Sequence, residues 1–161
     1  KIAGDKFDES IIKYVRNKYK IMIGEKTAED VKIKIGSAFK DSRKLTTTMK
    51  GRNLITGLPD EVEISTEEVR EALAEPVSVI VEGVKSILEK TPPELAAEGI
   101  LMTGGGALLD GLNKLIEENT GVTVEIAHNS VEAVAEGTGQ VLSYIDKLGS
   151  DIFGSEINLI D

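Results

Sequence analysis

A short apolar run that ends in three consecutive glycines most constrains the fold of this chain. The run Gly99–Thr103 has the composition of a buried strand, and Gly104, Gly105 and Gly106 follow it directly. Leucines spaced for an amphipathic helix come next, and a further alternating strand is predicted over residues 122–126. Strand, helix and strand in this order predict a parallel βα arrangement with right-handed crossovers.

The first part of the chain is predicted to hold two helices. Apolar residues recur at three- and four-residue spacing over residues 7–19, which indicates an amphipathic helix already in progress. A chain that begins in this way, with no strand ahead of the helix, looks cut from something longer. Gly24 breaks the pattern, and Thr27 with Asp30 predicts a capping box for a short second helix that ends near Gly36.

Two strands are predicted after these helices. Threonine-rich alternation predicts the first strand over residues 44–49, because β-branched side chains favour strands. The second strand is predicted over residues 62–64, and the glycines, asparagine and proline between residues 51 and 59 are assigned to the connection.

Three more helices are predicted in the rest of the chain. Ser65 and Glu68 form a second capping box before the longest helical pattern, in which Pro76 should kink or divide the helix. Thr91 is predicted to cap a short helix with Pro92 at its first position. The apolar spacing over residues 131–145 predicts the last helix.

Composition excludes several classes of function. The 161 residues hold 19 Lys and Arg against 28 Asp and Glu, a formal charge of −9, which argues against a nucleic-acid partner. The absence of cysteine excludes disulfides and thiolate chemistry, and a single histidine makes a histidine-based zinc site or a Ser-His-Asp triad hard to assemble. No apolar run approaches the roughly 20 residues of a membrane span. We expect a cytoplasmic α/β protein.

The glycine run is the first candidate site. A strand followed by glycines and a helix leaves backbone N–H groups free at a helix N-terminus, where phosphate binds well. The glycines also let a ligand approach the backbone closely. Neither the dinucleotide fingerprint nor the P-loop motif is complete here, because position 109 is Leu and no Lys follows the glycines. Spacing alone leaves open a phosphate site and a plain tight turn.

The second candidate site lies on the second helix. Glu29 and Lys32 are three residues apart and so share one helical face, where they suit ribose hydroxyls and an adenine edge. An exposed ion pair between the two side chains is the alternative interpretation. His128 is interpreted as a loop residue rather than a ligand or a base.

Four segments of the sequence resemble one family. They are spread along the chain in order and cover nearly all of it: Gly4–Glu9, Ile23–Lys32, Lys90–Leu95 and Leu101–Leu109. Together they resemble MreB, the bacterial actin of the superfamily that also contains sugar kinases and heat-shock chaperones.

The resemblance implies an α/β fold, the actin-like ATPase domain with its ribonuclease-H-like motif. This chain resembles only the second half, or domain II. Residues 1–31 and 74–150 would form a larger, incomplete subdomain, and residues 32–73 a smaller α+β subdomain inserted into it. Residues 151–161 would be a tail. The family implies ATP or ADP with Mg²⁺ as cofactor, with the magnesium site mainly in the other half.

The resemblance also assigns binding residues. Gly104, Gly105, Gly106 and Ala107 match the adenosine motif, which lies beneath the α-phosphate and the sugar of the nucleotide. The helix that contacts ribose and adenine is matched by four consecutive residues, namely Glu29, Asp30, Val31 and Lys32. No residue of this chain is assigned to catalysis or to a metal.

Other family elements have no counterpart in this sequence. Both phosphate loops and the catalytic acidic residues precede the segment that matches Lys1, so we expect no ATP hydrolysis by this chain alone. The complete protein is expected to be a slow, filament-linked ATPase that determines cell shape. The implied partners are other copies of itself, cell-shape morphogenetic proteins, and the inner membrane through regions outside this chain.

The sequence leaves three alternative functions open. An ATPase lobe of another actin or chaperone superfamily member fits the glycine run less well than MreB does. A nucleotide-dependent transferase or kinase lobe would need a phosphate-loop lysine or an acidic metal-binding pair near the glycines, and neither is visible. A purely structural α/β interaction module is the remaining alternative.

Overall fold

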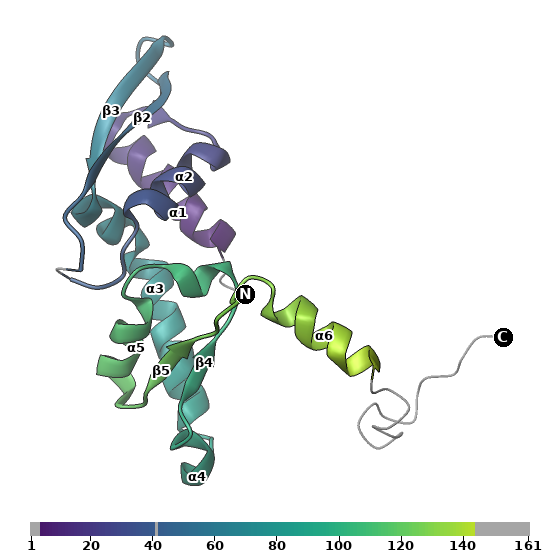
Figure 1. The fold of residues 1–161 in the computed structure, drawn as a ribbon. Coiled ribbons are helices and arrows are strands. Elements are labelled where there is room, and N and C mark those ends of the chain that lie inside the picture. Colours follow the sequence, from purple (N-terminus) through teal and green to yellow (C-terminus); the bar gives the residue numbers. More distant parts are fainter. Residues whose placement is uncertain (1–3, 41, 144–161) are drawn as a thin grey trace.

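The computed structural model describes residues 4–40 and 42–143. Helices α1 (Gly4–Tyr19) and α2 (Glu25–Ile35) pack against each other and against a three-stranded antiparallel sheet in the order β1-β2-β3. Its strands are β1 (Ile21–Met22), β2 (Thr46–Asn53) and β3 (Pro59–Ser65). Helix α3 (Thr66–Leu88) continues from this group into the other half of the molecule (Figure 1).

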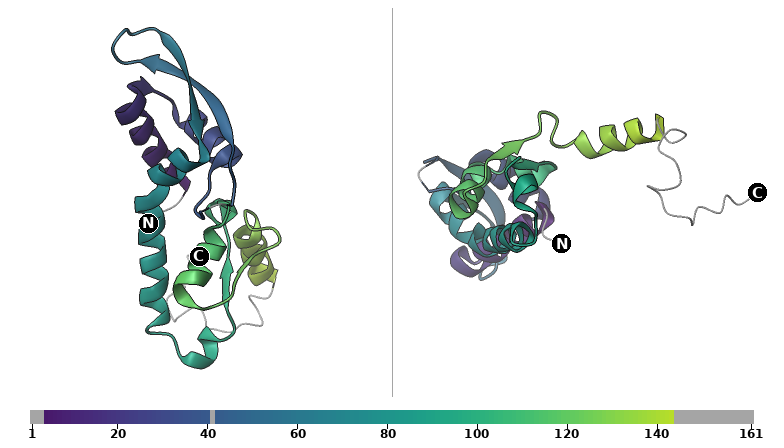
Figure 2. Two further views of the ribbon diagram at one scale, coloured as in Figure 1. Left: turned by 90° about the vertical axis from the view of Figure 1, so that its left-hand side faces the viewer. Right: turned by 90° about the horizontal axis from the view of Figure 1, so that it is seen from below.

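The other half contains a parallel pair of strands. Strand β4 (Ile100–Met102) pairs with β5 (Val124–Ile126), which confirms the predicted parallel arrangement. Helix α5 (Leu112–Thr120) lies between them in sequence and packs on α3, and the single turn α4 (Pro93–Ala96) follows α3. Helix α6 (Ala133–Ser143) extends away from the rest (Figure 2).

One continuous hydrophobic core joins both halves. Helix α1 buries Phe7, Ile11 and Val15, as its spacing predicts, and the core extends to Ile116 of α5 and Val124 of β5. Because α3 crosses both halves, its apolar face is shared between them.

Contacts cross the predicted boundary at residue 31. Strand β1 lies within residues 1–31, yet it pairs with β2, which lies within residues 32–73, in the register Ile21↔Asn53. Helices α1 and α2 also pack with this sheet. The boundary stays a prediction, and the contacts of the described residues place no gap there. The predicted tail, 151–161, lies outside the described residues.

The capping box before α3 is confirmed. The Ser65 hydroxyl accepts a hydrogen bond from the Glu68 N–H at 3.3 Å, and the Glu68 carboxylate accepts one from the Ser65 N–H at 2.9 Å. Pro76 does not divide α3, which is a single helix from Thr66 to Leu88. The Pro76 ring is buried on the side of α3 that lines the space next to α1, where packing offsets the missing hydrogen bond.

The start of α2 differs from its prediction. The helix begins at Glu25 after Gly24, and Thr27 lies inside it rather than at its cap. The extended backbone of Gly24 allows its carbonyl to accept a hydrogen bond from the Ala28 N–H at 3.1 Å, so the first turn closes without a side-chain cap. Similarly, Pro92 rather than Thr91 precedes the first turn of α4.

Strand β2 extends four residues beyond its predicted end, through Gly51 to Asn53. Glycine permits this because β1 passes close by: a Cβ at position 51 would lie 2.4 Å from the Met22 carbonyl oxygen. The turn therefore comes later, where the Asn53 side-chain oxygen accepts hydrogen bonds from the N–H groups of Ile55 and Thr56.

Strand β4 is less buried than its composition predicts. The Leu101 side chain is 65% exposed. Among the described residues, β4 pairs only with β5, so its other edge and one face have no protein against them. A parallel sheet is ordinarily covered on both faces, and apolar composition reflects that fuller environment.

Candidate functional site

The glycine run forms a tight turn with an open outer side. Gly104 has a φ of +86°, a conformation that favours glycine, and a 3₁₀ turn from Gly105 to Leu108 follows it. A Cβ added at Gly104 or Gly105 would have no atom within 4 Å. A ligand therefore has direct access to this stretch of backbone.

The inner side of the same turn is held by the protein. The Gly104 N–H donates to the Ser130 carbonyl, and the Ala107 N–H donates to the Gly104 carbonyl at 3.1 Å. The Ala107 side chain is buried. A Cβ at Gly106 would meet the Phe7 ring at 4.0 Å, so the turn lies over the first turn of α1. The expected regular helix start is thus a 3₁₀ turn, and α5 begins later, at Leu112.

The second predicted set of residues lies on α2 and divides by burial. Glu29 and Asp30 are exposed, whereas Val31 is 3% exposed and belongs to the core. The Lys32 side chain is mostly buried, and its amine lies 2.9 Å from Asp8 Oδ1 and 3.0 Å from Asp8 Oδ2. The ion pair that Lys32 forms is therefore with α1 and not with Glu29.

The first turn of α1 contacts both predicted sets. Phe7 lies beneath Gly106, and Asp8 with the Gly4 carbonyl holds the Lys32 amine. Nothing in the sequence indicates that Phe7 and Asp8 belong with these sets, because they are close to them only in the folded chain. The structure thus brings both candidate sites to one short segment.

A second connection lies at the far ends of the two sets. Ser37, just after α2, forms a parallel bridge with Asp110, just after the 3₁₀ turn. The Ala38 N–H donates to the Asp110 carbonyl at 2.8 Å. The Asp110 carboxylate accepts a hydrogen bond from the Ser42 hydroxyl and lies 3.2 Å from the Arg43 Nε. Asp110 belongs to none of the motifs that the sequence contains.

A separate charged cluster joins α1 to α3. The Glu68 carboxylate contacts the Lys18 amine at 2.7 Å and the Tyr19 hydroxyl, in addition to its capping role. Burial raises the pKa of Glu68, but the hydrogen bonds from Lys18, Tyr19 and the Ser65 N–H outweigh it and lower the pKa to about 2. Burial and the bond to Glu68 raise the pKa of Tyr19 to about 12. These shifts arise from helix packing, away from the glycine turn.

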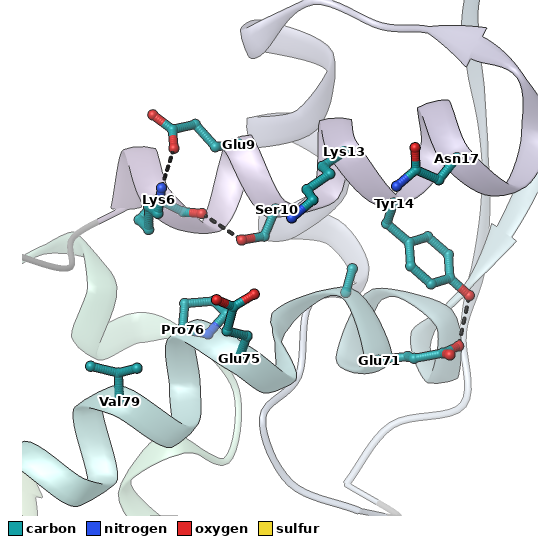
Figure 3. Close-up of a pocket in the computed structure, with 11 residues that line it drawn as sticks. Lys6, Glu9, Ser10, Lys13, Tyr14, Asn17, Glu71, Glu75, Pro76 and Val79 are labelled. Carbon is teal, nitrogen blue, oxygen red and sulfur yellow. Dashed lines mark hydrogen bonds and ion pairs between the residues drawn. The ribbon is translucent and has the colours of Figure 1, made fainter.

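Two hollows of the surface lie away from the predicted site residues. One groove runs between α1 and α3, where Lys6 and Tyr14 face Glu71 and Glu75 (Figure 3). It contains none of the predicted site residues.

His128 is exposed in the loop after β5, as predicted. In the described part of the chain, no three acidic or histidine side chains gather to hold a metal.

The sequence matches the model of one protein family, MreB/Mbl protein, over residues 1–150. The chain belongs to the MreB/Mbl family. The cell shape-determining protein Mbl of Bacillus subtilis is 48% identical over 152 residues, and the cell shape-determining protein MreB of Escherichia coli is 44% identical over 160. These alignments include 92% and 97% of this chain but only 46% of each relative, so the chain spans about half of their length.

Solved structures agree with this assignment. MreB5 of Spiroplasma citri bound to ADP is 41% identical and matches 92% of this chain with a TM-score of 0.85. A MamK double helical filament, at 19% identity and a TM-score of 0.65, shares the fold. The predicted actin-like α/β fold and the resemblance to MreB are therefore confirmed, and the family is one of actin-like, cell-shape-determining proteins. A kinase or transferase lobe and a chaperone ATPase lobe do not fit this membership. The structural interaction module is separated from a nucleotide-binding lobe by a binding measurement.

Proposed function

We propose that this chain supplies the adenosine-binding part of the nucleotide site in an MreB-type cell-shape protein. The proposal concerns a part because the chain spans 46% of its relatives. Its main support is the open turn at Gly104 and Gly105, where Gly104 has a positive φ and a ligand can reach the backbone. MreB5 of Spiroplasma citri, which is 41% identical, is solved bound to ADP and bound to AMPPNP, which supports a nucleotide as the ligand.

The residues present fit a nucleotide. Gly104, Gly105 and Gly106 expose backbone for the α-phosphate and sugar, with Ala107 packed beneath. Glu29 is exposed and free to accept hydrogen bonds from ribose hydroxyls. Lys32 is oriented by Asp8, and its ammonium group has three donors. Asp30 is exposed beside them, and Val31 contributes packing rather than side-chain contact.

The chemistry that a nucleotide brings is a phosphoanhydride bond whose hydrolysis releases free energy. We propose that the Mg²⁺ site and hydrolysis belong mainly to the other half of the complete protein, because the chain spans 46% of its relatives. This chain orients the adenosine end. In the complete protein we propose self-assembly into dynamic filaments, contact with cell-shape morphogenetic proteins, and association with the inner membrane through other regions.

The filament and membrane proposals rest on family membership alone. Across residues 4–40 and 42–143, no helix has both the length and the apolar character needed to cross a membrane. Sedimentation of the complete protein with ATP tests self-assembly. Pelleting that requires the nucleotide supports it, and a monomer at all concentrations contradicts it.

Calorimetric titration of this chain with ADP tests the site. Gly105→Asp places a charged side chain in the open space before the turn, and we expect its affinity to fall at least about tenfold because the carboxylate repels phosphate. Gly83→Asp is the matched control, since Gly83 is exposed on α3 with no atom within 4 Å of an added Cβ. Equal binding by both variants contradicts the assignment of the glycine turn.

A further inference from the structure

The candidate site has two arms, helix α2 and the 3₁₀ turn of the glycine run. Both end at one junction, which is the contact between the residues that follow them, 36–40 and 42–43 on one side and 109–111 on the other. Helix α2 ends at Ile35 and the 3₁₀ turn ends at Leu108, and the residues that follow, Ser37 and Asp110, bridge in parallel. The Ala38 N–H donates to the Asp110 carbonyl at 2.8 Å. The arms are thus connected by backbone where each one finishes.

Side chains reinforce this connection. The Ser37 hydroxyl is fully buried and accepts a hydrogen bond from the Phe39 N–H at 3.2 Å. Its single proton has three acceptors within reach, namely the Phe39 carbonyl at 3.0 Å, the Ser42 hydroxyl, and the Asp110 carbonyl at 3.4 Å. The Asp110 carboxylate accepts from the Ser42 hydroxyl and lies 3.2 Å from Arg43 Nε. One aspartate therefore holds the segment after α2 with both its main chain and its side chain.

Close packing prevents the junction from sliding. Gly111 has a φ of +71°, and a Cβ there would lie only 2.3 Å from the Phe39 Cβ. A Cβ at Gly36 would lie 3.1 Å from Leu109 Cδ1. At Gly111 the two segments approach each other so closely that only glycine fits, so a shift of one segment must move the other.

We infer that Asp110 is a positioning residue for the nucleotide: it holds the glycine turn at a defined place relative to Glu29 and Lys32. The inference rests on the proposed function. Asp110 sits after the turn and its carboxylate is directed to Ser42 and Arg43, so it acts through the junction rather than by contact. A ligand held at two places binds more tightly when those places are already correctly spaced.

The test compares ADP affinity among single variants of this chain. Asp110→Ala removes both side-chain contacts and is expected to weaken binding about tenfold, whereas Asp110→Asn keeps an acceptor for Ser42 and is expected to lose about threefold. Ser42→Ala, which leaves Asp110 in place, is expected to reproduce part of the loss. Glu118→Ala, which removes an exposed carboxylate from α5, is the matched control and is expected to bind as the parent does.

Hydrogen exchange separates positioning from general destabilisation. The exchange rate of the Ala38 amide measures how firmly the junction is closed, because this N–H donates to the Asp110 carbonyl. Ala38 is not one of the proposed binding residues, yet we expect ADP to slow its exchange in the parent chain. This protection is expected to disappear in Asp110→Ala under conditions where circular dichroism shows the variant folded. If the parent binds ADP and Asp110→Ala binds equally, the inference is overturned while the proposed function stands. If the parent chain does not bind, both fail.

Discussion

Lys32 on α2 and Asp8 on α1 form a two-oxygen ion pair, with the lysine amine 2.9 Å from one carboxylate oxygen and 3.0 Å from the other. Both side chains are mostly buried, with 16% and 13% of their surfaces exposed. The pair joins two helices whose residues are 24 positions apart. It therefore gives a candidate ligand-binding lysine a second, structural role.

Removal of one partner of this pair is expected to destabilise the fold. Asp8→Asn leaves the mostly buried Lys32 charge without its partner, at a cost of about 3 kcal/mol in unfolding free energy. Lys32→Met should cost a similar amount, and the double variant should cost less than the sum of the two. Urea denaturation of all four proteins gives the coupling free energy. Additive losses would show that the pair contributes nothing.

Gly51 is expected to tolerate no larger side chain. A Cβ at this position would lie 2.4 Å from the Met22 carbonyl oxygen and 2.5 Å from Ile21 Cγ2. Gly51→Ala must therefore separate β1 from β2, and we expect a loss of about 2–4 kcal/mol. Gly83→Ala in open space on α3 should instead stabilise by about 0.5–1 kcal/mol, because alanine favours a helix. Thermal melting of both variants compares the two; equal melting temperatures would refute the close approach of β1.

The Glu68 carboxylate is expected to make the fold less stable as the pH is lowered. Its pKa is lowered from 4.5 to about 2 in the folded chain, so the charged form stabilises the fold fully above about pH 5. This contribution is lost progressively as the pH falls from about 5 towards 2, because protonation breaks the bonds from Lys18 and Tyr19.

Glu68→Gln provides the comparison for this pH dependence. At pH 7 it should cost about 1–2 kcal/mol, and near pH 2 the difference from the parent should shrink. Denaturation curves from pH 7 to pH 2 measure this. If the difference in unfolding free energy between Glu68→Gln and the parent stays constant across this pH range, the effect comes from hydrogen-bond geometry and not from the charge. Glu67→Gln, one residue away on the same first turn, is the control.

Local signals predicted the elements well where neighbours along the chain decide them. The capping box of Ser65 and Glu68 can be recognised from two residues that are three positions apart. The buried face of α1 can be recognised from apolar residues that recur at three- and four-residue spacing. The order of strand, helix and strand also sufficed for the parallel pairing of β4 with β5. The same signals placed the glycine turn and α2 among candidate sites, because those residue types suit phosphate and sugar wherever they occur.

Other features depended on segments that are distant in sequence. The sequence predicts a turn at Gly51, but in the folded chain this glycine lies in β2 because β1 passes close to it. The sequence offers Glu29 as the partner of Lys32, but in the folded chain Lys32 pairs with Asp8. Asp110 has no signal in its own surroundings, since its contacts are about 70 residues away. Backbone periodicity and capping are set by neighbours within one turn, and so they can be read from the chain. The spacing between the two arms is set by packing in three dimensions, and only the folded structure contains it.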